Sequence, residues 1–275
     1  MAAIEIQQVA VEKDIVFGRG GARDLLCDVY RPPAGREKRV AVIQYHGGAF
    51  VTGTKEGTRV AEPLAALGYL GVSAQYRLAH EAKWPAQIQD VKACIRWTRA
   101  NAGELGVDPD KIVILGHSAG ANLSLLAAGS QNRPDLEGEG GNPGVGTQLA
   151  ACVAFYPPAT ARRAPDGGHP LFAQGSPEDA YRAISPVTYV SPGNPPTILL
   201  HGTADVTIPV EASFQLYRAL SEAGVPVELH IIEGVTHIFD AHPDFAELSA
   251  QWIDLFLDRH VANPRVYPST EPPAR

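Results

Sequence analysis

The chain has 275 residues, of which 45% are hydrophobic, and its formal net charge is −7. This length suits one large α/β domain, and the apolar content is enough for a large core. The sequence has no basic run, which argues against a nucleic-acid partner, and no apolar run near the roughly 18 residues of a membrane span.

The cysteines and the first residues bear on location. Cys27, Cys94 and Cys152 are odd in number and far apart, so we interpret them as buried apolar residues and not as bridges or metal ligands. The start of the chain has neither a basic region nor a long apolar run, so we expect no signal peptide and a reducing, cytoplasmic location.

The chain begins with two expected strands, at residues 4–11 and 25–30, joined by a turn at 18–21. From residue 40 onward, strands and helices alternate. Strands are expected at 40–45, 70–76, 112–115, 150–155, 197–201 and 227–232. Helices are expected at 58–67, 85–103 (capped by Gly103), 119–128, 211–223 and 243–259. This alternation predicts a mostly parallel sheet with helices on both faces.

Two loop-rich stretches interrupt the alternation. Residues 129–148 are rich in glycine, and residues 156–196 are rich in proline and glycine with only short helical segments. Loops of this length are usually functional or disordered, so we interpret both as lid-like insertions. The sequence therefore predicts a single domain over residues 1–260, followed by a loose tail at 261–275.

The segment from Gly116 to Gly120 is the centre of the functional prediction. It reads Gly-x-Ser-x-Gly, follows a short apolar strand and opens a helix rich in alanine and leucine. In that context the pattern is typical of a nucleophile elbow, in which Ser118 is lifted clear of the sheet. The two glycines fit because a Cβ at either position would collide with the tight turn. The alternative is an ordinary tight turn with a solvent-facing serine.

Partners for the serine follow later strands. A neutral serine needs a base within hydrogen-bond reach, and the base needs an orienting carboxylate. His237 follows the last strand and is the predicted base, and Asp205 follows the strand before it and is the predicted acid. The order Ser, Asp, His is the order of α/β-hydrolases. Glu233 and Asp240 are rival acids, but neither ends the preceding strand.

An oxyanion hole would need backbone N–H groups near the serine. Ala119 directly follows Ser118 at a helix N-terminus, and Gly48 and Ala49 follow the strand at 40–45. We predict that these three N–H groups form the hole. His46 is expected to brace this loop, and His117 is expected to be structural because adjacent side chains diverge at an elbow.

Several large side chains are candidates for lining a substrate pocket, although core packing would explain each of them as well. They are Phe50, Trp84, Tyr156, Phe172, Ile238 and Phe239. We expect Arg77 and Asp90 to form a structural ion pair rather than a substrate clamp.

Together, these motifs resemble the α/β-hydrolase-fold esterases, most closely the hormone-sensitive-lipase-like group and its bacterial feruloyl- and acetyl-esterase relatives. The matching segments are 46–50, 76–79, 116–120, 201–205 and 236–237, and the resemblance covers residues 25–258. It implies an α/β-hydrolase fold with about eight strands. It also implies carboxylic-ester hydrolysis without a cofactor or metal.

The chain departs from that pattern at three positions. Ala49 replaces the third glycine of the oxyanion motif, His117 stands where the lipase-like branch has aspartate, and His80 stands where the family has proline. No large helical cap precedes the oxyanion motif, which predicts an open acyl pocket. Of these departures, His117 favours the feruloyl- and acetyl-esterase branch.

The resulting prediction is a serine carboxylesterase, a monomer or homodimer, that hydrolyses short-chain or aromatic esters through an acyl-enzyme. One alternative is an amide hydrolase of the arylformamidase type with the same triad. Another is a ligand-binding protein on the same scaffold, like the plant hormone receptors of the family. That alternative predicts a lost triad residue, whereas His237 is present. A peptidase would need an additional domain.

Overall fold

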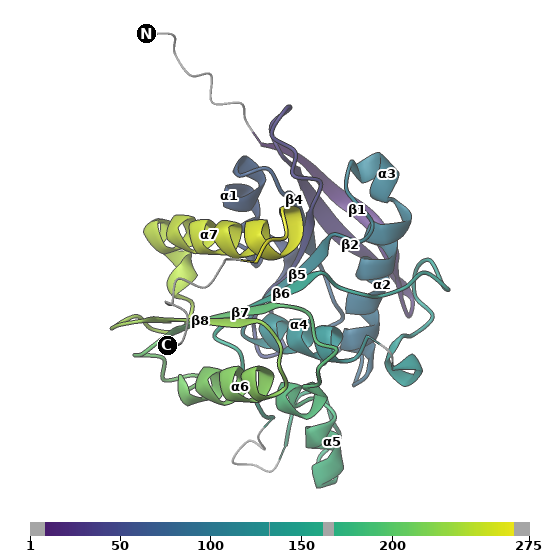
Figure 1. The fold of residues 1–275 in the computed structure, drawn as a ribbon. Coiled ribbons are helices and arrows are strands. Elements are labelled where there is room, and N and C mark those ends of the chain that lie inside the picture. The colour runs from purple at the N-terminus through teal and green to yellow at the C-terminus, as the bar shows by residue number, and fades with distance from the viewer. Residues whose placement is uncertain (1–8, 132, 162–167, 267–275) are drawn as a thin grey trace, which may run out of the picture.

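A mostly parallel sheet forms the centre of the protein. The computed structural model describes residues 9–131, 133–161 and 168–266, and within these ranges eight strands join in the order β1-β2-β4-β3-β5-β6-β7-β8 (Figure 1). β1 pairs antiparallel with β2, and β2 pairs antiparallel with β4, whereas β3 to β8 pair in parallel. The predicted fold class is therefore confirmed.

The strand bounds are β1 Ala10–Gly20, β2 Arg23–Arg31, β3 Ala41–Tyr45, β4 Leu70–Ala74, β5 Ile112–His117, β6 Ala151–Phe155, β7 Thr197–Gly202 and β8 Val227–Ile232. All residues of β3, β4, β5, β6 and β7 are buried. Their sequences are accordingly almost continuous apolar runs, because helices cover both faces of the sheet.

The helix bounds are α1 Ala61–Ala66, α2 Ala86–Ala100, α3 Ala102–Leu105, α4 Ala119–Gly129, α5 Glu178–Arg182, α6 Glu211–Glu222 and α7 Pro243–Leu257. α1 and α7 lie together over one face, and α2, α4 and α6 cover the other (Figure 1). Two separate apolar cores result, one on each face of the sheet.

The prediction of the first strand is wrong in position. β1 covers Ala10–Gly20, through the expected turn at 18–21, and residues 4–8 of the expected strand lie outside the described residues. The chain reverses at Gly21, whose φ is +62°. A bulge explains the error: Asp14 has a φ of +60°, and the register shifts between Glu12 and Ile15, which breaks the apolar alternation.

Two expected helix and domain ends also differ. The helix expected at 85–103 ends at Ala100, and Gly103 lies inside the short α3, whose left-handed cap is Gly106 with a φ of +73°. At the end of the domain, a one-turn π-helix continues to Ala262, and Val261 is buried in the core. The expected tail beyond residue 266 lies outside the described residues.

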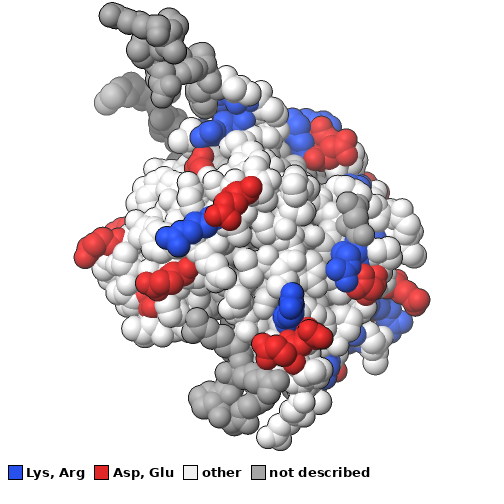
Figure 2. All heavy atoms as spheres, turned by 60° about the horizontal axis from the view of Figure 1, so that its bottom comes forward, with Lys and Arg blue, Asp and Glu red and all other residues white. Residues whose placement is uncertain are grey.

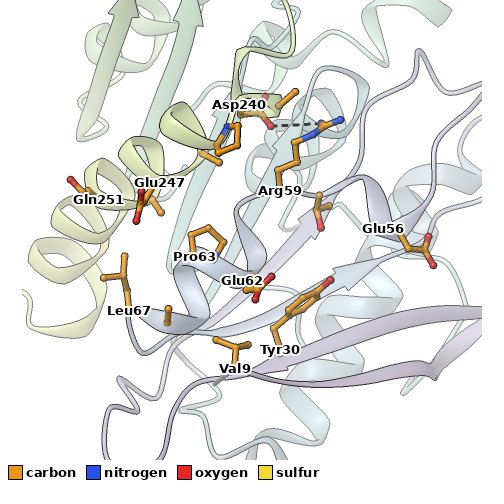
Figure 3. Close-up of a pocket in the computed structure, with 16 residues that line it drawn as sticks. Val9, Tyr30, Glu56, Arg59, Glu62, Pro63, Leu67, Asp240, Glu247 and Gln251 are labelled. Atoms are coloured by element: carbon orange, nitrogen blue, oxygen red, sulfur yellow. Dashed lines mark ion pairs between the residues drawn. The ribbon is translucent and has the colours of Figure 1, made fainter. Parts of the chain in front are cut away.

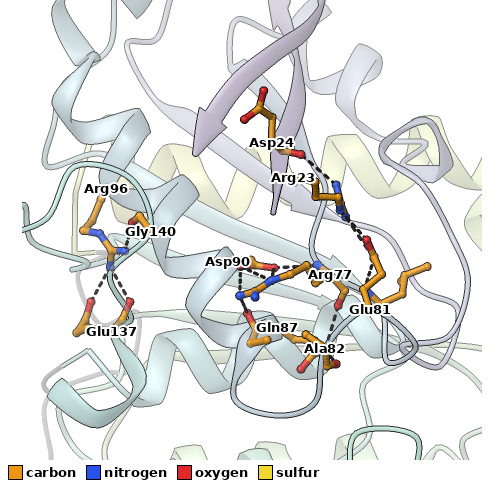
Figure 4. A network of polar contacts seen from close by, with 12 residues as sticks. Arg23, Asp24, Arg77, Glu81, Ala82, Gln87, Asp90, Arg96, Glu137 and Gly140 are labelled. Atoms are coloured by element: carbon orange, nitrogen blue, oxygen red, sulfur yellow. Dashed lines mark hydrogen bonds and ion pairs between the residues drawn. The ribbon is translucent and has the colours of Figure 1, made fainter. Parts of the chain in front are cut away.

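The glycine-rich stretch at 129–148 is bound to α2 by buried cations. Lys92 Nζ donates to the carbonyl oxygen of Ser130 at 2.6 Å and to Glu137 Oε1 at 2.7 Å. Arg96 Nη1 reaches Glu137 Oε2 at 3.1 Å (Figure 4). These contacts fasten the stretch to α2, and its lid-like role stays a prediction. The other stretch, 156–196, contains α5, and its residues 162–167 lie outside the described residues.

Several charged side chains on the face in Figure 2 form mixed pairs. On the face in Figure 2, basic and acidic side chains lie next to one another on a largely uncharged surface. Within the described ranges, no helix has the length and apolar character needed to cross a bilayer. Cys27, Cys94 and Cys152 are buried and free, as predicted, and burial raises the pKa of the Cys94 thiol to about 12.

Candidate active site

Ser118 lies at the sharp turn between β5 and α4. Its φ of 54° and ψ of −113° fall outside the regions that side-chain-bearing residues prefer. A Cβ on Gly116 would lie 2.1 Å from the carbonyl oxygen of Gly120, and a Cβ on Gly120 would lie 2.3 Å from that of Tyr45. Both glycines are thus required by close backbone contact, as expected for a nucleophile elbow.

The structure brings Ser118, His237 and Asp205 together. His237 Nε2 lies 3.1 Å from Ser118 Oγ, and His237 Nδ1 lies 2.6 Å from Asp205 Oδ2. The carboxylate can only accept, so Nδ1 carries the proton and Nε2 is free to accept the serine proton. Of the rival acids, Glu233 is exposed and Asp240 makes different contacts.

The carboxylate of Asp205 is held from both sides. Its Oδ1 accepts the backbone N–H groups of Thr207 and Ile208, both at 2.9 Å, and its Oδ2 faces His237 and, at 3.2 Å, His201 Nε2. Burial raises the pKa of Asp205, but the hydrogen bonds from His237 and the two N–H groups outweigh burial, and the pKa lies below its ordinary value. The carboxylate therefore stays ionised near neutral pH.

His201 also supports Asp205, although the sequence predicted no role for it. It is fully buried at the end of β7, its Nε2 donates to the carbonyl oxygen of Ile208 at 2.9 Å, and its Nδ1 accepts from Ser213 Oγ at 2.7 Å. Both ring nitrogens are occupied, so the ring fixes the loop that carries Asp205. The only sequence signal was a histidine four residues before the predicted acid.

The loop after β3 approaches the serine with an unusual backbone. Gly48, Ala49 and Phe50 have φ values of +106°, +52° and +66°, and a Cβ on Gly47 would lie 3.2 Å from Ser118 Cβ. The N–H groups of Gly48 and Ala49 donate no hydrogen bond within the described ranges.

Ala119 provides a third N–H beside the serine. It is the first residue of α4, where helix geometry leaves N–H groups without an intrahelical acceptor. Within the described ranges, the N–H groups of Gly48, Ala49 and Ala119 thus have no backbone acceptor, and their role as an oxyanion hole stays a prediction.

His46 lies beneath this loop. Its ring stacks on Tyr76 at 4.4 Å between centroids, and its Nδ1 lies 2.7 Å from the carbonyl oxygen of Gly47. Tyr76 Oη donates to the carbonyl oxygen of His46 at 3.2 Å. Burial lowers the pKa of His46, so the ring is neutral, as suits the predicted bracing role.

A small cavity of about 290 Å³ lies between the oxyanion loop, the start of α4 and the loop after Asp205. It is lined by Phe50, Asn122, Pro158, Ala159, Thr160, Ala161, His169, Ile184, Thr207, Ile208, Pro209, Glu211, Ala212 and Gln215. Of the predicted pocket residues, Phe50 is among these. Ile238, directly after His237, is 46% exposed, and Trp84 packs half-buried against the core. Their contact with substrate stays a prediction.

The other aromatic candidates are less accessible. Tyr156 is 1% exposed, and its ring lies 4.4 Å from that of His237, so it supports the histidine rather than presenting a lining surface. Phe239 is buried and packs edge-on against Tyr156. Phe172 packs 5.5 Å from the ring of His169, which itself lines the cavity.

A larger groove, of about 1170 Å³, opens between α1 and α7 (Figure 3). Pro63 and Leu67 line its α1 side, and Glu247 and Gln251 line its α7 side. Its wall nearest the active site contains Asp240. Within the described ranges, no cluster of His, Cys, Asp and Glu side chains is arranged to hold a metal ion.

Arg77 and Asp90 form the expected ion pair. Arg77 Nη2 lies 2.7 Å from Asp90 Oδ1, and Arg77 Nε lies 2.8 Å from Asp90 Oδ2 (Figure 4). Gln87 Nε2 donates to the carbonyl oxygens of Arg77 and Ala82 in the same network. The pair connects the segment after β4 to α2, which is a structural role.

The order of the strands, with the serine at the elbow after β5, defines an α/β-hydrolase, in agreement with the resemblance found in the sequence. The chain belongs to the BD-FAE family, whose model matches residues 27–220.

Two of the relatives that match most of this chain bear the names of ester hydrolases. Esterase LipQ of Mycobacterium tuberculosis is 33% identical over 244 residues, covering 84% of this chain and 58% of LipQ. The probable carboxylic ester hydrolase LipM of the same organism is 33% identical over 250 residues, covering 84% of this chain and 57% of LipM. The chain thus spans less than two thirds of these relatives.

Solved structures agree. A truncated carbohydrate esterase from gut microbiota superposes with a TM-score of 0.79 at 26% identity, covering 92% of this chain and 98% of that chain. Esterase 2 of Thermogutta terrifontis, solved with propionate bound, has a TM-score of 0.76 at 29% identity, covering 95% of this chain and 98% of that chain.

Proposed function

We propose that this protein is a serine carboxylesterase. The observation that carries the proposal is the chain of contacts from Ser118 Oγ to His237 Nε2 at 3.1 Å and from His237 Nδ1 to Asp205 Oδ2 at 2.6 Å. Membership of the BD-FAE family and the esterase names of its relatives support the same activity.

In the proposed reaction, Ser118 Oγ attacks the carbonyl carbon of the ester while His237 Nε2 takes the hydroxyl proton. The ionised Asp205 keeps His237 in the required tautomer and stabilises the positive charge that develops on the ring. His237 then protonates the leaving alcohol. In the second half-reaction, His237 activates the water that releases the acid from the acyl-enzyme.

The negative charge on the carbonyl oxygen would be held by the N–H groups of Gly48, Ala49 and Ala119. Gly48 and Ala49 have positive φ angles, so their N–H groups are not part of a strand or helix. Ala119 lies at the N-terminus of α4, which is the positive end of the helix dipole. Such donors are fixed before the reaction begins, so little reorganisation is needed in the transition state.

For substrates, we propose esters with short acyl groups. The cavity beside Phe50 has a volume of about 290 Å³, which is near the lower end of ligand pockets. The Thermogutta terrifontis relative was solved with propionate and with butyrate. Aromatic acyl groups remain part of the proposal and would place a ring against Phe50.

The test is hydrolysis of p-nitrophenyl esters from acetate to decanoate by the wild type and by Ser118→Ala. We expect activity to be highest at short chains and to fall about a millionfold in the variant. Retention of a tenth of the rate in Ser118→Ala would overturn the serine mechanism. Parallel assays on anilides decide between ester and amide hydrolysis, because an arylformamidase-type enzyme would prefer the amides.

The proposal extends to location and assembly. Three free, buried cysteines suit a reducing compartment, which we propose is the cytoplasm. We propose a monomer or homodimer acting on a small-molecule ester, which size-exclusion chromatography with light scattering would test.

A further inference from the structure

Asp240 is a buried carboxylate next to the proposed catalytic residues. It lies three residues after His237, in the 3-10 turn Phe239–Ala241, and its exposed fraction is 0%. Its Oδ1 accepts a short hydrogen bond from Tyr156 Oη. Its Oδ2 lies 3.3 Å from His117 Nε2 and 4.0 Å from Arg59 Nη1 (Figure 3).

Both uncharged partners of Asp240 contact the catalytic residues. The Tyr156 ring lies 4.4 Å from the ring of His237, and its hydroxyl donates to Asp240, so Tyr156 links Asp240 to His237. His117 directly precedes Ser118, and its ring stacks on Phe155 at 4.7 Å. The Asp240 carboxylate therefore contacts both Tyr156, which packs against His237, and His117, which precedes Ser118.

The fold alone does not account for this carboxylate. Taking a charge out of water costs several kcal/mol, which only well-formed contacts offset. The contact between His117 and Asp240 Oδ2 is close but is not aligned as a hydrogen bond, and burial lowers the pKa of His117, so the ring is neutral. The nearby cation, Arg59, is 4.0 Å away and 42% exposed at its side chain.

We propose that Asp240 is a positioning residue for the hydrolysis: it fixes Tyr156 against His237, and so sets the angle at which the imidazole meets Ser118 Oγ. The inference rests on the proposed function. A tyrosine ring without this hydrogen bond could rotate or shift within its packing, and the imidazole would lose its support. Displacements of about 1 Å from the reactive geometry can cost roughly a hundredfold in rate.

The protein contains a matched control. Tyr69 is also fully buried, and its Oη donates to Asp254 Oδ1 at 2.8 Å on α7. This second tyrosine–aspartate pair touches neither the elbow nor the loop of His237. Asp254 is half-buried and also pairs with Lys38 Nζ, so Tyr69→Phe reports the loss of a partly buried tyrosine–aspartate hydrogen bond away from the reaction.

The experiment measures three variants: Tyr156→Phe, Asp240→Asn and the double variant that carries both changes. Tyr69→Phe is the control. We expect kcat for a short p-nitrophenyl ester to fall about tenfold to a hundredfold in Tyr156→Phe and Asp240→Asn, with KM changed by less than about twofold. The double variant should be no slower than the slower single variant, because both changes remove one interaction. Tyr69→Phe should keep the wild-type kcat.

The outcomes separate this inference from the proposed function. Loss of activity in Ser118→Ala together with unchanged kcat in folded Tyr156→Phe and Asp240→Asn would overturn the inference and leave the esterase intact. Equal losses of kcat in Tyr156→Phe and Tyr69→Phe would also overturn it, because the effect would then come from stability.

A spectroscopic readout needs no substrate. The proton between His237 and Asp205 should give a proton NMR signal far downfield, assigned by its absence in His237→Ala. We expect that signal to shift or broaden in Asp240→Asn and to stay unchanged in Tyr69→Phe. An unmoved signal in Asp240→Asn would overturn the inference even if no ester were hydrolysed.

Discussion

Replacing Asp205 by asparagine would change the direction of one hydrogen bond while keeping the size of the side chain. Asp205 Oδ1 accepts two backbone N–H groups, from Thr207 and Ile208, each at 2.9 Å. The amide oxygen of the asparagine must remain there, because an NH2 group facing two N–H donors would leave three buried donors without an acceptor. The NH2 group would therefore face His237.

That orientation forces the imidazole into the wrong tautomer. His237 Nδ1, 2.6 Å from the replaced atom, would have to accept a hydrogen bond, so Nε2 would carry the proton and could no longer accept one from Ser118. Loss of the correct tautomer in a Ser-His-Asp triad costs about 10⁴-fold in kcat. This corresponds to about 5 kcal/mol of transition-state stabilisation.

The assay is steady-state hydrolysis of p-nitrophenyl butyrate by the wild type and by Asp205→Asn, with circular dichroism to establish that both are folded. Glu233→Gln is the matched control, since Glu233 is exposed and makes no contact with His237 in the described structure. A loss below about tenfold in Asp205→Asn, with a large loss in Glu233→Gln, would refute the assignment of the acid.

Three further outcomes concern stability. Burial lowers the pKa of His46, His117 and His201 below the ordinary 6.5, so below that pH the unfolded chain binds protons that the folded chain does not. The free energy of unfolding, measured by urea titration, should fall on acidification from about pH 7 to pH 5, by up to about 1.4 kcal/mol per pH unit for each ring, and a flat profile would contradict their neutral state. Gly120→Ala should lower the free energy of unfolding by about 1–3 kcal/mol, because the Cβ of the alanine would lie 2.3 Å from a carbonyl oxygen of β3. An unchanged melting temperature would contradict the elbow geometry. Glu137→Gln should lower the free energy of urea unfolding by about 2 kcal/mol, because it leaves the buried Lys92 and Arg96 without their carboxylate. The loss is smaller than for a fully buried pair because Glu137 is partly exposed. The value of kcat should not change.

Local features of the sequence were sufficient for most of the fold. The apolar runs of β3 to β7 and the alternation with helices predicted a mostly parallel sheet, because a strand covered on both faces must be apolar throughout. The elbow was predictable for the same kind of reason. Gly116 and Gly120 are fixed by contacts within a few residues of Ser118 and with the adjacent strand.

The errors occurred where the local pattern was broken. The bulge at Asp14 interrupts the alternation of β1, so the predicted strand stopped at residue 11, whereas β1 continues to Gly20. The helix predicted to end at Gly103 ends at Ala100, and of Gly103 and Gly106 only Gly106, at the end of α3, has the left-handed conformation of a helix cap.

The sequence by itself determined the order of strands and helices, the elbow and the residue types that such chemistry requires. The tertiary structure decided which of them meet. Among Asp205, Glu233 and Asp240, only the register of β7 against β8 and the course of the following loops place Asp205 on His237, 32 residues away. The contact of Asp240 with Tyr156 joins residues 84 apart. Backbone sterics and apolar periodicity act between neighbours in the chain and can be read from it, whereas contacts across such separations depend on how every intervening element packs.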